Sequence, residues 1–192
     1  MSTNPVARGF LLSNLAVILC CGCYVLWWIL AFNPVSPVRG IRSGWLLIPA
    51  FVAGLVGIVL AVWTGSQARV SSRLFVPWRL VVAGVAAYLV VLLITRLIFG
   101  RQVTAELFLM VGWAVLVLYQ LNALYGVGVF DRHRAEIFSA VVLAALFVFL
   151  VCYTIYYHLG VRSGFVVGII PLALGGVVVA VISAGVWHSL GR

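Results

Sequence analysis

Lysine is absent from this chain of 192 residues, so all 12 basic residues are arginine. Without lysine, the chain has neither the P-loop that binds nucleotide phosphates nor a Schiff base with pyridoxal phosphate or retinal. Acids are almost as scarce, since only Glu106, Asp131 and Glu136 occur. Too few ionisable groups reach the apolar segments for acid–base chemistry, and we expect a protein that is not an enzyme.

Charged residues of both signs make up only 8% of the chain, whereas 66% of the residues are hydrophobic. A soluble domain needs about a quarter of its residues charged to cover its surface. The mean hydropathy of +1.27 therefore excludes a soluble domain and predicts an integral membrane protein. Membrane lipids are its expected surroundings, and we expect no nucleic-acid partner.

The hydrophobic residues gather in long uninterrupted runs, separated by turn residues such as glycine and proline. A bilayer core of ~30 Å needs about 20 apolar residues in a helix. Strands of a barrel would be shorter and would alternate in polarity. The sequence therefore predicts an all-α integral membrane protein that forms one transmembrane domain over residues 1–192. Six transmembrane helices are expected: Phe10–Phe32, Trp45–Trp63, Leu80–Phe99, Leu107–Tyr125, Ile137–Tyr157 and Phe165–Trp187.

Arginine counts in the short connections predict the orientation. Seven arginines lie in the two termini and the second and fourth connections, and five lie in the other three connections. The side with more arginine usually faces the cytoplasm, so both termini are expected there. Richness in arginine, alanine, valine and glycine without lysine is typical of a GC-rich bacterial genome, which suggests a bacterial inner membrane.

Two segments on different predicted hairpins resemble each other. Cys23–Leu30 and Cys152–Leu159 share three of eight residues, and each precedes an Arg-Ser-Gly-aromatic tetrad, Arg42–Trp45 or Arg162–Phe165. A weaker copy lies in the middle of the chain. We expect three tandem helical hairpins, at about residues 10–64, 80–126 and 137–187. Their approximate threefold axis would lie along the membrane normal, although a linear row of hairpins is the alternative.

Each hairpin contributes one tyrosine and one arginine to the candidate sites. Hydroxyl groups in hydrocarbon need hydrogen-bond partners. The tyrosines Tyr24, Tyr88 and Tyr153 would therefore either join helices or line a cavity for a small neutral or cationic solute. Asn14 and Gln120 belong to the same set of polar residues at mid-depth.

The arginines Arg42, Arg101 and Arg162 each precede a helix. In a threefold bundle they would form a ring with three helix amino termini, which is an arrangement suited to an anion. The alternative is contact with lipid phosphates. Glu106 lies in the first turn of its predicted helix beside Arg101, where it would pair with an arginine or serve the site.

Small residues at every fourth position predict close helix packing in the second and sixth spans. The second span has Ala53, Gly57, Ala61 and Gly65, and the sixth has Gly176, Ala180 and Ala184.

The cysteines and histidines predict no metal and no cofactor. Cys20 and Cys23 lie in an apolar helix, and there is no second cysteine pair or nearby histidine to complete a site.

These features favour a non-catalytic protein that binds or passes a small solute, either a neutral or cationic one at the tyrosines or an anion at the arginine ring. The alternative is an accessory or structural subunit that contacts a membrane-protein partner or a second copy of itself. An internal cavity lined by the tyrosines favours the first class, and a solid core with an exposed stripe of small residues favours the second.

Overall fold

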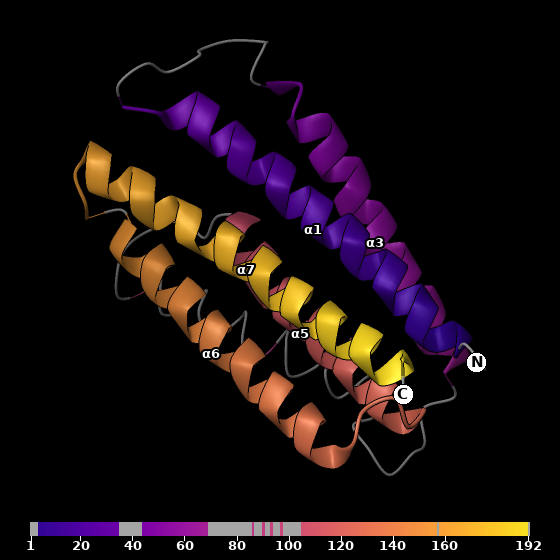
Figure 1. Ribbon diagram of the computed structural model, residues 1–192. Helices are drawn as coiled ribbons and strands as arrows, with labels where there is room; N and C mark the ends of the chain where they lie inside the picture. Colours follow the sequence, from indigo (N-terminus) through magenta and orange to yellow (C-terminus); the bar gives the residue numbers. More distant parts are fainter. Residues whose placement is uncertain are drawn as a thin grey trace.

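The computed structural model describes residues 4–34, 44–68, 105–156 and 158–191, and the isolated positions 86, 90, 93 and 97. Within these ranges the chain is helical, without strands. The third predicted span, Leu80–Phe99, lies mostly outside them. Figure 1 shows five helices: α1 (Pro5–Phe32), α3 (Leu47–Gln67), α5 (Ala105–Gly126), α6 (Arg132–Tyr156) and α7 (Val161–Leu190). All five are long and apolar enough to cross a membrane, as expected for a multi-pass membrane protein.

Helix ends follow the local chemistry of the sequence. Asn4 caps α1, because its side-chain oxygen accepts a hydrogen bond from the Val6 backbone nitrogen at 3.0 Å. Asp131 caps α6 in the same way, with the Arg134 backbone nitrogen 2.8 Å away. Between α5 and α6 the chain turns at Gly128, whose φ of 74° favours glycine.

Contacts between helices establish their directions. Ser13 of α1 binds Gly57 of α3, while Gly9 lies beside Thr64, so these two helices are antiparallel. The α1–α7 and α6–α7 pairs are antiparallel as well, and the short turn at Gly128 makes α5 antiparallel to α6. Therefore α3, α5 and α7 run in one direction and α1 and α6 in the other. Figure 1 shows both chain ends at the same end of the bundle.

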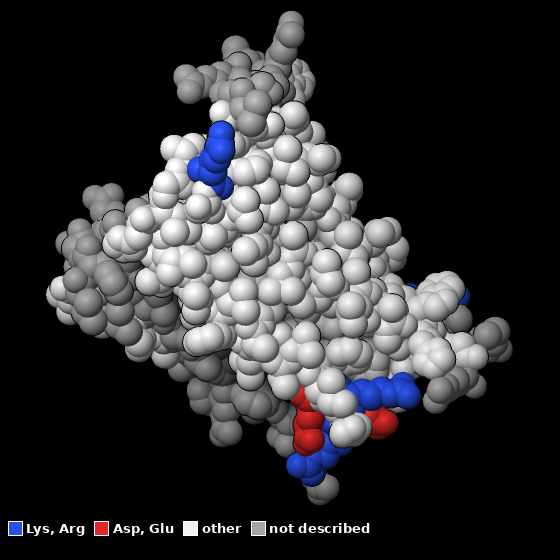
Figure 2. All heavy atoms as spheres, turned by 60° about the vertical axis from the view of Figure 1, so that its left-hand side comes forward, with Lys and Arg blue, Asp and Glu red and all other residues white. Residues whose placement is uncertain are grey.

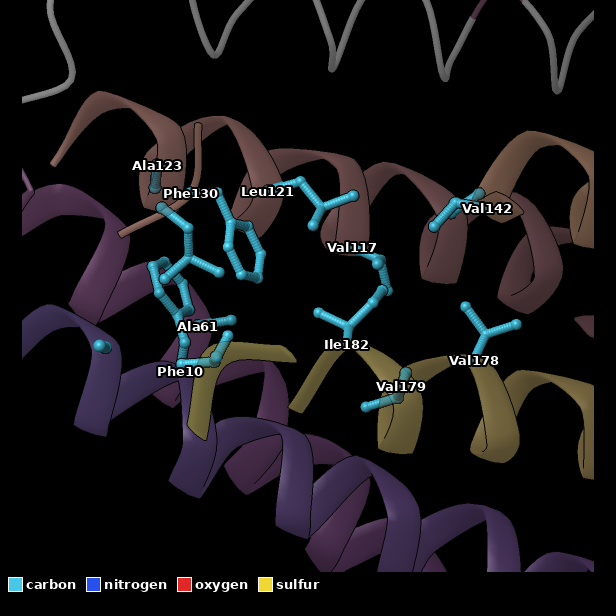
Figure 3. Close-up of a cluster of buried hydrophobic side chains, with 14 of the residues drawn as sticks. Phe10, Ala61, Val117, Leu121, Ala123, Phe130, Val142, Val178, Val179 and Ile182 are labelled. Atoms are coloured by element: carbon cyan, nitrogen blue, oxygen red, sulfur yellow. The ribbon is translucent and has the colours of Figure 1, made fainter. Parts of the chain in front are cut away.

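The helix α5 lies at the centre of the described bundle and contacts α1, α3, α6 and α7. Its buried side chains include Val117 and Leu121, which belong to one continuous hydrophobic core. Figure 3 shows Ile182 of α7 pointing toward Val117 of α5. Phe10 and Phe130 are also almost completely buried in this core. The centre of the described bundle is therefore filled by side chains.

The small residues of α3 are buried in helix contacts, as predicted. Ala53, Gly57, Ala61 and Gly65 are all buried. A Cβ atom on Gly57 would lie only 2.8 Å from Cγ2 of Val17 and 3.2 Å from the backbone oxygen of Ser13. Glycine is needed here because the two helix backbones approach so closely. The prediction that this stripe is buried is confirmed, and we call Ala53, Gly57 and Ala61 the α1–α3 seam. Gly65 lies against Tyr119 of α5 instead.

The corresponding prediction for α7 is wrong for two of its three residues. Gly176 packs near Cys21, but Ala180 and Ala184 are exposed on the outer surface of the bundle. Different glycines make the close contacts of α7: Gly168 meets Trp28 of α1, and Gly185 meets Phe138 of α6. Gly168 belongs to the same fourth-position series as Gly176, but each four-residue step rotates the face by about 40° on an α-helix. Ala180 and Ala184 therefore lie on a different side of α7 from the residues that contact α1.

The charged side chains that the structure describes lie near the ends of the helices. Arg8 begins α1, the group Asp131 to Glu136 begins α6, and Arg162 begins α7 at the opposite end. Figure 2 shows a broad uncharged surface between the charged regions. An uncharged belt between polar ends suits a bilayer.

Candidate functional site

A polar cluster interrupts the apolar core where α1, α5 and α7 meet. Its members are Ser13 and Asn14 of α1, Gln120 of α5 and Ser183 of α7. Ser13, Asn14 and Gln120 are each 1% exposed or less, and Ser183 is half-buried. We call these four residues the polar junction. Its position inside a membrane-spanning bundle requires each polar atom to find a partner within the protein or in a bound molecule.

Four hydrogen bonds hold the polar junction together. The Ser13 hydroxyl donates to the backbone oxygen of Gly57 at 2.7 Å, and Gln120 Nε2 donates to Ser13 Oγ at 3.3 Å. On the other side, Ser183 donates to the backbone oxygen of Val179 at 2.7 Å, and Asn14 Nδ2 donates to Ser183 Oγ at 3.1 Å. Each serine thus joins one amide side chain to a helix backbone.

Both amide side chains of the junction keep one end unpaired. Asn14 Oδ1 and Gln120 Oε1 are buried and have no hydrogen-bond partner among the described residues. An unsatisfied buried polar atom typically destabilises a protein by about 1–3 kcal/mol. Two such acceptors at one helix junction require an explanation, and either an ordered water or a bound molecule would supply it.

A third unpaired polar atom lies deeper along the same helix. The indole Nε1 of Trp113 is buried without a partner in the described part of the chain. Trp113 stands seven residues before Gln120 on α5, which is about 10 Å along the helix axis. Its ring packs against Phe149 with a centroid separation of 5.0 Å. This donor is therefore separate from the polar junction.

The predicted tyrosine site is only partly described. Tyr24 of α1 is half-buried, with its ring 5.2 Å from that of Trp27. Tyr153 of α6 is 9% exposed, and Tyr88 lies outside the described residues. A cavity shared by the three tyrosines is still a prediction.

The predicted arginine ring has one described member. Arg162 is exposed in the first turn of α7, whereas Arg42 and Arg101 lie outside the described residues. Glu106 is in the first turn of α5, as expected, and only its backbone position is described. The anion site at this end is therefore also still a prediction.

The two segments that resemble each other in sequence, near Trp28 and near Tyr156 to Phe165, contact each other at the end of the bundle opposite the termini. The indole nitrogen of Trp28 donates a hydrogen bond to the backbone oxygen of Phe165 at 3.1 Å. The same indole lies edge-on to Tyr156, with ring centroids 5.9 Å apart. These contacts join the end of α1 to the start of α7 and the end of α6.

A half-open pocket of about 280 Å³ lies near the termini, between the start of α6 and the end of α7. Ile137, Phe138 and Gly185 give it a mostly apolar lining, and Arg134 and His188 complete its wall. Arg134 is already engaged, because it donates to Ser189 at 3.0 Å and lies 3.9 Å from Asp131. Its guanidinium group therefore already has two polar partners at the pocket wall.

No group of three or more histidine, cysteine or acidic residues that could hold a metal ion occurs within the described ranges. Cys20, Cys21 and Cys23 are half-buried in α1, and Cys152 is buried in α6.

Sequence reasoning found part of the polar junction. It singled out Asn14 and Gln120 as polar residues at mid-depth, but it did not include Ser13 and Ser183. Serine is common in membrane helices and usually bonds to its own backbone, as Ser183 does. The adjacency of Ser13 to Asn14 was the one signal available, since two polar residues in succession are unusual in an apolar helix.

Comparison with known proteins gives no relative for this chain: no protein-family model, curated protein or solved structure matches it. The function must therefore be argued from the residues themselves.

Proposed function

We propose that this protein is a six-span membrane protein that binds a small solute at the polar junction, as a non-catalytic binding or permeation protein. The two unpaired acceptors, Asn14 Oδ1 and Gln120 Oε1, carry this proposal. They lie in a core that is otherwise filled by apolar side chains. A solute that donates hydrogen bonds to them would relieve the penalty of burying them unpaired.

The proposed sixth span rests on the directions of α3 and α5 and on the spacing of the exposed helical residues between them. Because α3 and α5 run the same way, a further span within residues 69–104 would return the chain from one end of the bundle to the other. Four positions in this segment are helical and exposed, at spacings of four, three and four: Ala86, Val90, Leu93 and Leu97. That spacing places them on one helix face, and their apolar side chains suit lipid.

The contacts of Trp28 support the proposed internal repeat. They bring the motif of the first hairpin against the motif of the third, at one end of the bundle.

We further propose that this end is outside the cytoplasm, because the arginine counts favour cytoplasmic termini. Labelling a Ser2→Cys variant tests the orientation, and reaction with an impermeant thiol reagent added outside the cell contradicts it.

Mass spectrometry of the purified protein tests the proposed solute. The protein is isolated in lipid nanodiscs and denatured, and the small molecules that it releases are identified. We expect the wild type to release a small polar compound at about one per chain, and the Asn14→Leu/Gln120→Leu double variant to release none. Thr64→Val is the matched control, since it removes a buried hydroxyl at the α1–α3 seam, away from the junction. Equal release from all three proteins contradicts the proposal.

Two observations favour the second candidate function, an accessory subunit or a homo-oligomer. The first is the centre of the described bundle, which is filled by side chains. The second is on α7, where Ala180 and Ala184 are exposed beside Val177 and Val181 and form a smooth apolar face. Small exposed residues allow another helix to approach closely. Ala184→Phe would then weaken association, as measured by cross-linking in native membranes, whereas Val166→Phe at an exposed position near the other end of α7 would not.

A further inference from the structure

The serines of the polar junction fix which end of each amide faces into the core. Ser13 has one hydroxyl proton, and it points at the backbone oxygen of Gly57, 2.7 Å away. Only lone pairs of Ser13 Oγ are left for Gln120. Rotating the Gln120 amide would place an oxygen against that acceptor, so its nitrogen must face Ser13 and its oxygen must be the unpaired atom.

The same logic applies independently to Asn14. Ser183 uses its proton on the backbone oxygen of Val179 at 2.7 Å. The Asn14 amide nitrogen therefore faces Ser183, and Asn14 Oδ1 is left without a partner in the described part of the chain. Both unpaired atoms of the junction are thus hydrogen-bond acceptors, as a consequence of the serine geometry.

The charges near the junction limit the ligand further. The chain has only three acids, and Asp131 and Glu136 are exposed at the start of α6. Glu106 precedes Gln120 by 14 residues on α5, which is about 21 Å along the helix. A cation bound here would lack a nearby counter-charge in a low-dielectric core, which is strongly unfavourable. An anion would face two carbonyl oxygens and would be repelled.

From these observations we infer that the polar junction selects a small uncharged molecule that carries N–H or O–H donors. This inference rests on the proposed function and specifies its ligand class. It also separates the junction from the predicted arginine ring, whose guanidinium groups would suit an anion. Donor groups of the ligand meet both Asn14 Oδ1 and Gln120 Oε1.

Thermal unfolding in nanodiscs with paired probes tests this class. The donor probes are 1,2-ethanediol and N-methylacetamide, and their methylated counterparts without donors are 1,2-dimethoxyethane and N,N-dimethylacetamide. Methylammonium chloride and sodium sulfate supply a cation and an anion. At ten times its Kd, a donor probe should raise Tm by roughly 3 °C. The shift should be absent in Asn14→Leu and in Gln120→Leu, and present in Thr64→Val.

Each outcome decides the ligand class. A donor-specific shift that both junction variants abolish supports the inference. Equal shifts with the methylated probes, or no shift with any probe, overturn it. A larger junction-dependent shift in Tm with methylammonium or sulfate also overturns the proposed ligand class, but it still supports solute binding at the junction. The mass-spectrometric comparison tests solute binding separately. If one junction variant does not fold, the other gives the same readout, because each removes one acceptor.

Discussion

The two sides of α1 differ in how completely they satisfy their polar groups. Toward α3, the seam is closed by small residues, and the Ser13 hydroxyl is bonded to the Gly57 backbone. Toward α5 and α7, two amide oxygens are buried without partners among the residues that the structure describes. One helix thus combines a seam that fixes the fold with a junction that retains unused acceptors. The seam should be intolerant of added volume, whereas the junction should respond to ligand.

The largest expected effect comes from overfilling the seam. Leucine at Gly57 would collide with Val17 and with the backbone of Ser13, and a helix backbone cannot move aside as a side chain can. We expect Gly57→Leu to lower the free energy of unfolding by about 3 kcal/mol. Val59→Leu, two residues along on the exposed face, is the control and should change little. Equal thermal stability of the two variants in detergent would refute the seam.

Ser13 connects the seam to the junction, and its removal sharpens the comparison. Ser13→Ala leaves the Gly57 oxygen and the Gln120 amide without their shared partner. We expect a loss of about 1–2 kcal/mol in chemical denaturation. Ser66→Ala removes a hydroxyl with a similar 2.7 Å bond, to Trp63, at an exposed position. A loss at Ser66 as large as that at Ser13 would mean that burial of the junction has no energetic consequence.

A substitution at Trp28 tests whether α1 and α7 pack tightly at the end of the bundle away from the termini. Trp28→Phe keeps an aromatic ring but removes the hydrogen bond to Phe165. The expected loss is about 1 kcal/mol, a typical net value for one such bond. Trp63→Phe, at a position 65% exposed, should have a smaller effect. A Tm for Trp28→Phe that matches the wild type would show that this hydrogen bond does not stabilise the protein.

The smallest effect should occur far from both sides of α1. Arg132 and Glu136 form an ion pair at 2.7 Å, one helical turn apart and largely exposed. Surface pairs of this kind contribute little because water and salt screen them. Glu136→Gln should therefore leave Tm unchanged within error at physiological salt. A clear drop in Tm would show that this end of α6 is part of a tightly organised region.

Several parts of the fold follow directly from composition and spacing. Span lengths predicted all five described helices, and the glycines near 126–128 predicted the turn before α6. The α3 stripe was also predictable, because four small residues at fourth positions define one helix face. The α7 stripe was not, since contact at Gly168 or Gly185 depends on where Trp28 and Phe138 lie in three dimensions.

The candidate site was less predictable than the fold. Asn14 and Gln120 stood out as amides in apolar helices, but they lie on helices far apart in the chain. Their meeting depends on the packing of α1 against α5, which no local pattern specifies. The repeat directed attention to the tyrosines and arginines because similarity is visible in a sequence, whereas an unpaired acceptor becomes visible only when its neighbours are known.

A high-resolution experimental structure in lipid nanodiscs, without added solute, tests the central claim most directly. The account predicts non-protein density within hydrogen-bond distance, about 2.7–3.2 Å, of Asn14 Oδ1 or Gln120 Oε1, and larger than a single water. Either an empty junction or amide oxygens that are satisfied by the protein itself or by a lone water would contradict it.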